Sequence, residues 1–152
     1  MTTYVKDIDT GEQTGLDQIR FFQSGGLNYK GIGQKLGFDL TEVEEGRVVF
    51  AATPNEDAYN PLGNVHGGYI ATLLDSALGC AVHTTLKPRR GYTTLELKIN
   101  YLRAMSASTG RIEAEGRVVQ TGRRAAFAEG KVTDAKGRIY ATATTTCLVF
   151  EK

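Results

Sequence analysis

The sequence predicts an α+β fold in which a curved antiparallel sheet wraps around one long central helix. Three observations indicate this class. Residues 69–82 are apolar at nearly every angle of a helix, which is typical of a buried helix. Runs of alternating apolar and polar residues lie on both sides of that segment, and tight turns join the later runs. Consecutive strands joined by tight turns pair antiparallel.

The first part of the chain predicts a short helix and a hairpin. Thr14 and Asp17 have the spacing of a capping box and precede apolar residues at helical spacing, while Gly25 and Gly26 favour a stop. Residues 38–43 and 48–53 are β-prone runs separated by a polar turn. The helix is expected to lie against the main body.

The segment after the central helix predicts four strands. In the first, Leu95, Leu97, Ile99 and Tyr101 alternate with polar residues, which indicates one buried face. Further strands are expected near residues 111–118, 126–132 and 138–150. Several of their residues have short side chains, so the helix can approach the sheet closely. These residues are Ala114, Gly116, Ala126, Ala128, Gly130, Ala141 and Ala143.

Length and composition restrict the function classes. A chain of 152 residues favours a single domain over 1–152, with 1–35 as an N-terminal leader and short helix. The formal net charge of +1 argues against nucleic acid as a partner. The central helix is too short and interrupted to cross a membrane. The first 13 residues lack the apolar run of a signal peptide, and with two cysteines a cytoplasmic location is expected.

A single carboxylate interrupts the apolar helix. Between Ala58 and Leu86, Asp75 is the only Asp, Glu, Lys or Arg. Burying an unpaired carboxylate costs several kcal/mol, so Asp75 must be hydrogen-bonded, protonated or open to a cavity. It is either a general base or nucleophile with a raised pKa, or a structural Asp satisfied by hydroxyls such as Thr72 and Ser76 or facing a wet interface.

The loop before this helix carries glycines at the helix start. Free backbone N–H groups there can bind an anionic oxygen, and Gly67 and Gly68 let a substrate approach them without a Cβ in the way. A tight turn with close helix packing is the alternative role. His66 and His83 have no acidic or cysteine cluster beside them, so no metal site is expected.

Taken together, these residues resemble the signature of hotdog-fold acyl-CoA thioesterases of the phenylacetic-acid-degradation (PaaI) type. The resemblance implies hydrolysis of an acyl-CoA to a free acid and coenzyme A, with CoA as part of the substrate and no separate cofactor. It also implies a homodimer, often doubled to a homotetramer, whose active sites lie between subunits. The residues that carry it are Asn60, Gly63, His66, Gly67, Gly68, Leu74, Asp75 and Gly79.

The resemblance also assigns roles. The Gly67 N–H, assisted by Asn60, would polarise the thioester carbonyl, and Asp75 would act as base or nucleophile. Thr94, which follows Thr93, matches a family position that orients water. His66 shapes the loop more than it moves protons. Gly68 and Tyr69 are expected near the substrate.

Basic residues in two turns could bind the phosphates of coenzyme A, although solvated turns are the simpler interpretation. These residues are Arg89, Arg90 and Arg123.

Two other functions stay open at this point. A hotdog hydratase or dehydratase would need a His paired with an acid, and only His66 is available. A non-catalytic acyl-CoA binding module would have the same fold without turnover.

Overall fold

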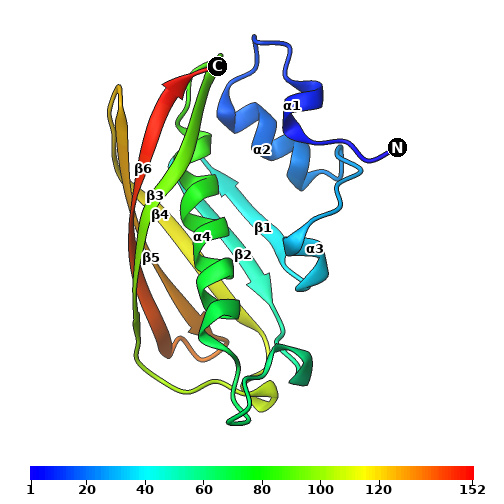
Figure 1. Cartoon of the computed structure of the whole chain (residues 1–152), viewed down its shortest axis with the longest axis vertical. Helices are drawn as coiled ribbons and strands as arrows, with labels where there is room; N and C mark the ends of the chain where they lie inside the picture. The colour runs from blue at the N-terminus through cyan, green and yellow to red at the C-terminus, as the bar shows by residue number, and fades with distance from the viewer.

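The structure is a computed structural model that describes residues 1–152, and it confirms the predicted α+β architecture. Six antiparallel strands form one sheet that curves around helix α4 (Gly67–Thr84), as Figure 1 shows. Along the sheet the strands follow the order β1-β2-β4-β5-β6-β3, so β1 and β3 are its edges. The strands are β1 (Asp39–Glu44), β2 (Arg47–Ala52), β3 (Arg90–Tyr101), β4 (Ile112–Thr121), β5 (Ala125–Asp134) and β6 (Ile139–Glu151).

The core lies between one face of α4 and the sheet. Leu73, Leu74 and Leu78 on this face are fully buried. Opposite them the sheet carries short side chains, as predicted, and the closest approach is at Gly116. A Cβ at Gly116 would lie 2.5 Å from the Ala77 carbonyl oxygen, which is far below a van der Waals contact. Glycine is therefore what lets the helix sit this close to β4.

The expectation that α4 is enclosed on every side is wrong for the single chain. Gly68 and Asp75 are exposed, and Ala71, Thr72 and Ser76 are partly exposed. These five residues recur at helical spacing and form a stripe on the face turned away from the sheet. Only one side of this apolar helix is packed on the sheet, which leaves the stripe open to other groups.

Strand β3 contains a β-bulge that the alternating pattern did not predict. The pairing of β3 with β6 shifts register between Thr94 and Glu96, so Leu95 is the extra residue. Leu95 is 61% exposed and does not join the buried face, contrary to the prediction. Leu97 and Ile99 do pack against the core. The bulge brings Thr94 onto the same face of the sheet as Leu97 and Ile99, because one inserted residue reverses the alternation.

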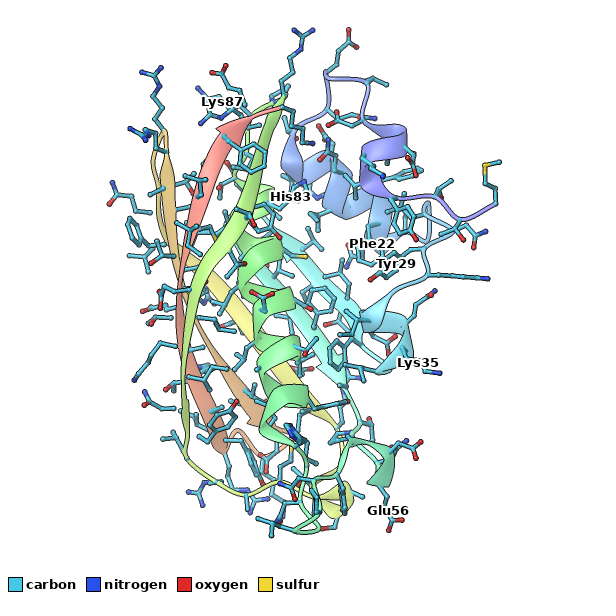
Figure 2. The ribbon with its side chains drawn as sticks, viewed as in Figure 1. Phe22, Tyr29, Lys35, Glu56, His83 and Lys87 are labelled. Carbon is cyan, nitrogen blue, oxygen red and sulfur yellow. The ribbon has the colours of Figure 1, made fainter.

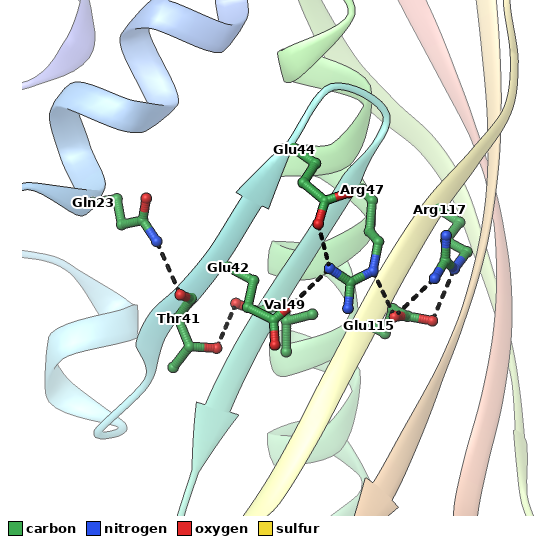
Figure 3. A network of polar contacts seen from close by, with 8 residues as sticks. All are labelled: Gln23, Thr41, Glu42, Glu44, Arg47, Val49, Glu115 and Arg117. Atoms are coloured by element: carbon green, nitrogen blue, oxygen red, sulfur yellow. Dashed lines mark hydrogen bonds and ion pairs between the residues drawn. The ribbon is translucent and has the colours of Figure 1, made fainter.

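The hairpin of β1 and β2 forms at the predicted place and is tied to its neighbours by charge. Gly46 in the turn has φ 75°, a left-handed conformation that favours glycine. The Arg47 guanidinium then contacts Glu42 at 2.6 Å and Glu115 at 2.7 Å, which joins β1, β2 and β4 (Figure 3). Arg47 is mostly buried, so these bonds hold the end of the sheet against which α4 packs.

The N-terminal segment folds into α1 (Val5–Ile8), α2 (Gly15–Gln23) and α3 (Ile32–Lys35), which lie over β1 and the end of α4 (Figure 1). The predicted capping box is present at α2: the Asp17 N–H donates to Thr14 Oγ1 at 3.2 Å, and the Thr14 N–H donates to Asp17 Oδ2 at 2.9 Å. The Gln23 side chain donates to the Thr41 carbonyl at 3.0 Å and connects α2 to β1.

Two short 3-10 helices, η1 (Glu56–Ala58) and η2 (Ala107–Thr109), lie in loops near the start of α4. None of the helices combines the length and hydropathy needed to cross a bilayer.

Candidate active site

The start of α4 is fixed by a histidine cap. His66 is the residue before the first helical turn, and the Gly68 N–H donates to its Nδ1 at 2.8 Å. Because Nδ1 accepts this bond, the neutral ring carries its proton on Nε2. His66 therefore shapes the helix start, which agrees with the role that the resemblance gave it.

The Gly67 N–H is left without an acceptor in the chain. It is the first residue of α4, where no helical carbonyl can reach it, and no loop or side-chain group accepts from it. Tyr101 holds the other side of this residue by donating its hydroxyl to the Gly67 carbonyl at 2.7 Å. Gly67 and Tyr101 line a cleft of about 310 Å³ with Met105. A free N–H at a helix N-terminus, open to a cleft, can stabilise an oxyanion.

Asn60 shapes the loop that leads to Gly67. Its Oδ1 accepts from the Leu62 N–H at 2.9 Å and from the Asn64 N–H at 3.3 Å. The backbone N–H of Asn60 donates to the Asn64 carbonyl at 2.8 Å. Its side-chain oxygen is thus used within the loop, and only its amide NH₂ is free to approach a substrate carbonyl.

Asp75 is held by a hydroxyl from β3. Thr94 Oγ1 donates to Asp75 Oδ1 at 3.0 Å, and the neighbouring Thr93 is exposed. The hydroxyls of α4 do not hold Asp75, because Thr72 donates to the Gly68 carbonyl and Ser76 to the Thr72 carbonyl, each at 2.8 Å. The hydroxyl that satisfies this carboxylate comes from Thr94 instead. Asp75 is exposed in the single chain, so any desolvation of this carboxylate must come from a group that covers it.

The Gly67 N–H and the Asp75 carboxylate do not come together within one chain. Gly67 and Asp75 are eight residues apart on α4, which corresponds to ~12 Å along the helix axis. They also line different cavities. An oxyanion donor and a directly attacking group lie within roughly 8 Å of each other when they act on one carbonyl. Within one chain the donor and the carboxylate therefore line separate cavities.

The cavity that Asp75 lines also contains neutral side chains toward the end of α4. Burial raises the pKa of Cys80 to about 12 and also raises the pKa of Tyr92. Burial lowers the pKa of His83 to about 4, and Lys152 adds to this effect. His83 also bonds Gln18 through Nε2 at 2.7 Å. These groups are uncharged at neutral pH, so Asp75 borders an apolar region.

The basic residues lie at the opposite end of α4 from Gly67. Figure 2 marks this end with Lys87, while Glu56 marks the end that carries the glycine loop. Arg90 pairs with Glu151 at 3.3 Å and donates to the Arg123 carbonyl. Arg90 and Arg123 line a common surface hollow, and Arg89 beside them has φ 62°. Arg90 and Arg123 thus lie together, separated from Gly67 by the length of the helix, while the Arg89 side chain lies against Gly11.

The structure uses Tyr69 differently from the expectation. Tyr69 is buried, its hydroxyl donates to the Leu36 carbonyl at 3.2 Å, and its ring meets Phe38 edge to face. It lines neither the cavity at Gly67 nor the cavity at Asp75. The preceding residue, Gly68, is exposed, and its N–H donates to His66 Nδ1. Tyr69 therefore belongs to the core.

Sequence reasoning missed several residues near Asp75. Tyr92, Phe22 and Tyr29 line the same cavity as Asp75. The signal that could have revealed two of them is the cluster of aromatic residues in the leader, from Phe21 to Tyr29. Across the chain, no group of three or more His, Cys, Asp or Glu side chains is brought together in a way that could hold a metal ion.

Comparison with known proteins gives one family. The model of the thioesterase superfamily matches residues 62–141, which include the loop, α4 and most of the later strands. A putative esterase of Saccharolobus solfataricus is 32% identical over 108 residues, covering 71% of this chain and 75% of the relative. The 1,4-dihydroxy-2-naphthoyl-CoA hydrolase of Listeria monocytogenes is 25% identical over 122 residues, covering 80% of this chain and 98% of the relative.

Solved structures agree with this result. A Streptococcus mutans protein crystallised with acetyl-CoA is 32% identical, with a TM-score of 0.69 over 76% of this chain and 90% of that protein. The phenylacetic acid degradation protein PaaI of Thermus thermophilus, in a mutant form, is 29% identical, with a TM-score of 0.69 over 76% and 96%. The Escherichia coli PaaI protein has a TM-score of 0.77 at 18% identity, over 90% and 94%, and shows the fold alone. The likeness confirms the hotdog fold.

Proposed function

The chain belongs to the thioesterase superfamily, and on this premise we propose that it hydrolyses acyl-CoA thioesters to a free acid and coenzyme A. The observation that carries the proposal is the free Gly67 N–H at the start of the helix that also holds Asp75. Thioester hydrolysis needs a donor for the developing oxyanion and a group that supplies the nucleophile. Gly67 and Asp75 have these two chemistries.

In the proposed reaction, the Gly67 N–H and the amide of Asn60 bind the thioester oxygen. Asp75 either removes a proton from water as the water attacks the carbonyl carbon, or attacks that carbon itself to give a mixed anhydride that water then hydrolyses. In both routes the tetrahedral intermediate collapses, the C–S bond breaks, and the thiolate of coenzyme A takes a proton. Thr94 donates to one Asp75 oxygen, which leaves the other oxygen free for the reaction.

The proposal places each active site between two copies of the chain. The separation of ~12 Å along α4 between Gly67 and Asp75 supports this arrangement, because a second chain can bring its own Gly67 to Asp75. The exposed stripe on α4 and the unpaired edge of β3 are the surfaces available for such a dimer. A tetramer of two such dimers is part of the proposal.

We assign the coenzyme A phosphates to Arg89, Arg90 and Arg123. Arg90 and Arg123 line one hollow at the end of α4, Arg89 precedes Arg90 in the chain, and guanidinium groups suit phosphate oxygens. Charge reversal at Arg89 and Arg90 should raise the KM for acyl-CoA and leave kcat nearly unchanged, because these contacts are equal in the ground and transition states. An unchanged KM would remove the cluster from the site.

The two alternative functions have less support. A hydratase needs a histidine that accepts a proton, and His66 Nδ1 is already used by the Gly68 N–H while its Nε2 carries the proton. A binding module needs neither a free N–H at Gly67 nor a carboxylate that a hydroxyl orients, and this chain has both.

Release of free thiol from a panel of acyl-CoAs tests the proposal. We expect turnover by the natural chain and loss of at least 100-fold in kcat for Asp75→Asn, with Asp57→Asn in the preceding loop as a control that keeps activity. Binding without thiol release would support the binding module, and hydration of an enoyl-CoA without thiol release would support the hydratase. Hydrolysis of a single turnover in labelled water separates the two roles of Asp75, since label enters the enzyme carboxylate only if a mixed anhydride forms.

A further inference from the structure

A cavity of about 600 Å³ lies between the N-terminal segment, β1 and the outer face of α4, and Asp75 is part of its lining. The lining residues of the N-terminal segment include Phe22, Tyr29 and Ile32. Those from the rest of the chain include Tyr92 and Cys80. The cavity thus connects the proposed catalytic carboxylate with a part of the chain that lies outside the matched residues 62–141.

We infer that residues 4–34 form the outer wall of an acyl pocket, and that this pocket takes an apolar acyl group much larger than acetyl. The inference rests on the proposed thioesterase function, and it adds the residues that determine which acyl group is accepted. The volume of the cavity supports this inference. Pockets of ~300–1,000 Å³ bury ligands of drug size, whereas an acetyl group would leave most of the 600 Å³ unfilled.

The lining of the cavity selects for an apolar group. Its aromatic residues are Tyr4, Phe22, Tyr29, Phe38, Phe50 and Tyr92, and no Lys or Arg is among its lining residues. Two of these rings, Phe22 on α2 and Tyr29 in the loop before α3, meet edge to face with centroids 5.5 Å apart (Figure 2). Toward the end of α4, burial keeps Cys80 protonated and His83 neutral. An anionic acyl group would meet Asp39 and Asp75 here and no Lys or Arg to offset its charge.

The wall is tied to the rest of the chain through α2. There the Gly15 N–H donates to the Leu86 carbonyl at 2.9 Å, and Gln18 bonds His83. Between Gly26 and Gly31 no backbone hydrogen bond joins the segment to the sheet or to α4. Substitutions in this wall can therefore change the shape of the pocket without moving Asp75 or Gly67.

Two substitutions in the wall test the inference. Gly33 lines the cavity, and a Cβ there would meet only the Phe38 Cβ at 4.0 Å, so Gly33→Phe can fill the pocket without a backbone clash. Phe22→Ala removes a ring from the wall. The matched control is Phe21→Ala, since Phe21 is the neighbouring ring on α2 but lies outside the lining. Circular dichroism and thermal unfolding of each variant establish that it is folded.

The measured quantity is kcat/KM for acetyl-CoA, decanoyl-CoA and 2-naphthoyl-CoA. We expect the natural chain to prefer the two bulky substrates. Gly33→Phe should lower kcat/KM for them by roughly 10-fold or more and leave acetyl-CoA within about twofold, because each lost methylene contact alone changes specificity by ~10-fold or more. Phe22→Ala should also lower the preference, and Phe21→Ala should not.

The outcomes separate the inference from the proposed function. If no acyl-CoA is hydrolysed, the proposed function fails. If the natural chain hydrolyses acyl-CoAs but prefers acetyl, or if Gly33→Phe and Phe22→Ala both keep the natural preference while folded, the inference is wrong and the thioesterase proposal stands. If Phe22→Ala does not fold, the result with Gly33→Phe decides, since a Cβ at Gly33 meets a single atom at van der Waals distance.

Discussion

Two inactive variants should restore each other's activity if Gly67 and Asp75 act across a subunit interface. Gly67→Pro removes the N–H that we assign to the oxyanion, and Asp75→Asn removes the base or nucleophile. Proline suits the first position of a helix, and His66 before it already has the extended conformation, φ −62° and ψ 135°, that a following proline requires. Each variant alone should lose about 100-fold or more in kcat.

The expected recovery follows from counting sites. If the two variants exchange subunits at random, about half of the dimers are mixed, and each mixed dimer has one site with both natural groups. The mixture should therefore recover about a quarter of the natural kcat, measured as thiol release after joint refolding or coexpression. Recovery is expected because the two groups lie ~12 Å apart along α4 in one chain.

Gly67→Ala is the matched control for the loss of the N–H. It places the same Cβ against Tyr101, at 3.2 Å, but keeps the donor. We expect it to be much more active than Gly67→Pro. If the mixture of folded variants stays inactive while the dimers exchange subunits, both groups act within one chain and the geometric reasoning is refuted.

Three further predictions concern contacts in the body of the molecule. Thr94→Val should lower kcat by roughly 10-fold, because it removes the hydrogen bond to Asp75 but keeps the side-chain shape. Thr93→Val, on the exposed side of β3, should have no effect on kcat. Equal kcat values for the two variants would contradict this prediction. Gly116→Ala should lower the free energy of unfolding by about 1–3 kcal/mol in urea titrations, because its Cβ meets the backbone of α4. The free energy of unfolding should fall by ~3 kcal/mol as the pH is lowered from 6.5 to about 4. In this range His83 becomes protonated in the unfolded chain but stays neutral in the folded chain, where its pKa is lower. His83→Gln should flatten this part of the pH profile.

The order of the elements was predictable because it depends on local patterns. The uniformly apolar run predicted α4, and alternation with turn residues predicted the hairpin and the later strands. The capping box at Thr14 and the close approach at Gly116 were also correct, since both follow from side-chain size and short-range hydrogen bonds. The length of α4 and the strand boundaries differ from the prediction by a few residues only.

The exposure of individual side chains was less predictable, because it depends on what packs above them. A helix apolar on all sides was expected to be covered, but the chain covers one face of α4 and leaves Asp75 open. The β-bulge at Leu95 likewise has no signal in an alternating sequence, and it decides that Thr94 rather than Thr93 bonds Asp75.

The sequence by itself determined the chemistry: an isolated carboxylate on an apolar helix, and a pair of glycines at the start of that helix. Only the tertiary structure decided how these groups are arranged. It turned Thr94 toward Asp75, brought the aromatic residues of the leader to the same cavity, and separated Asp75 from Gly67 along a rigid helix. The reason is that residue types and spacings are local properties, whereas a site is made by the register of strands and the packing of segments distant in the chain.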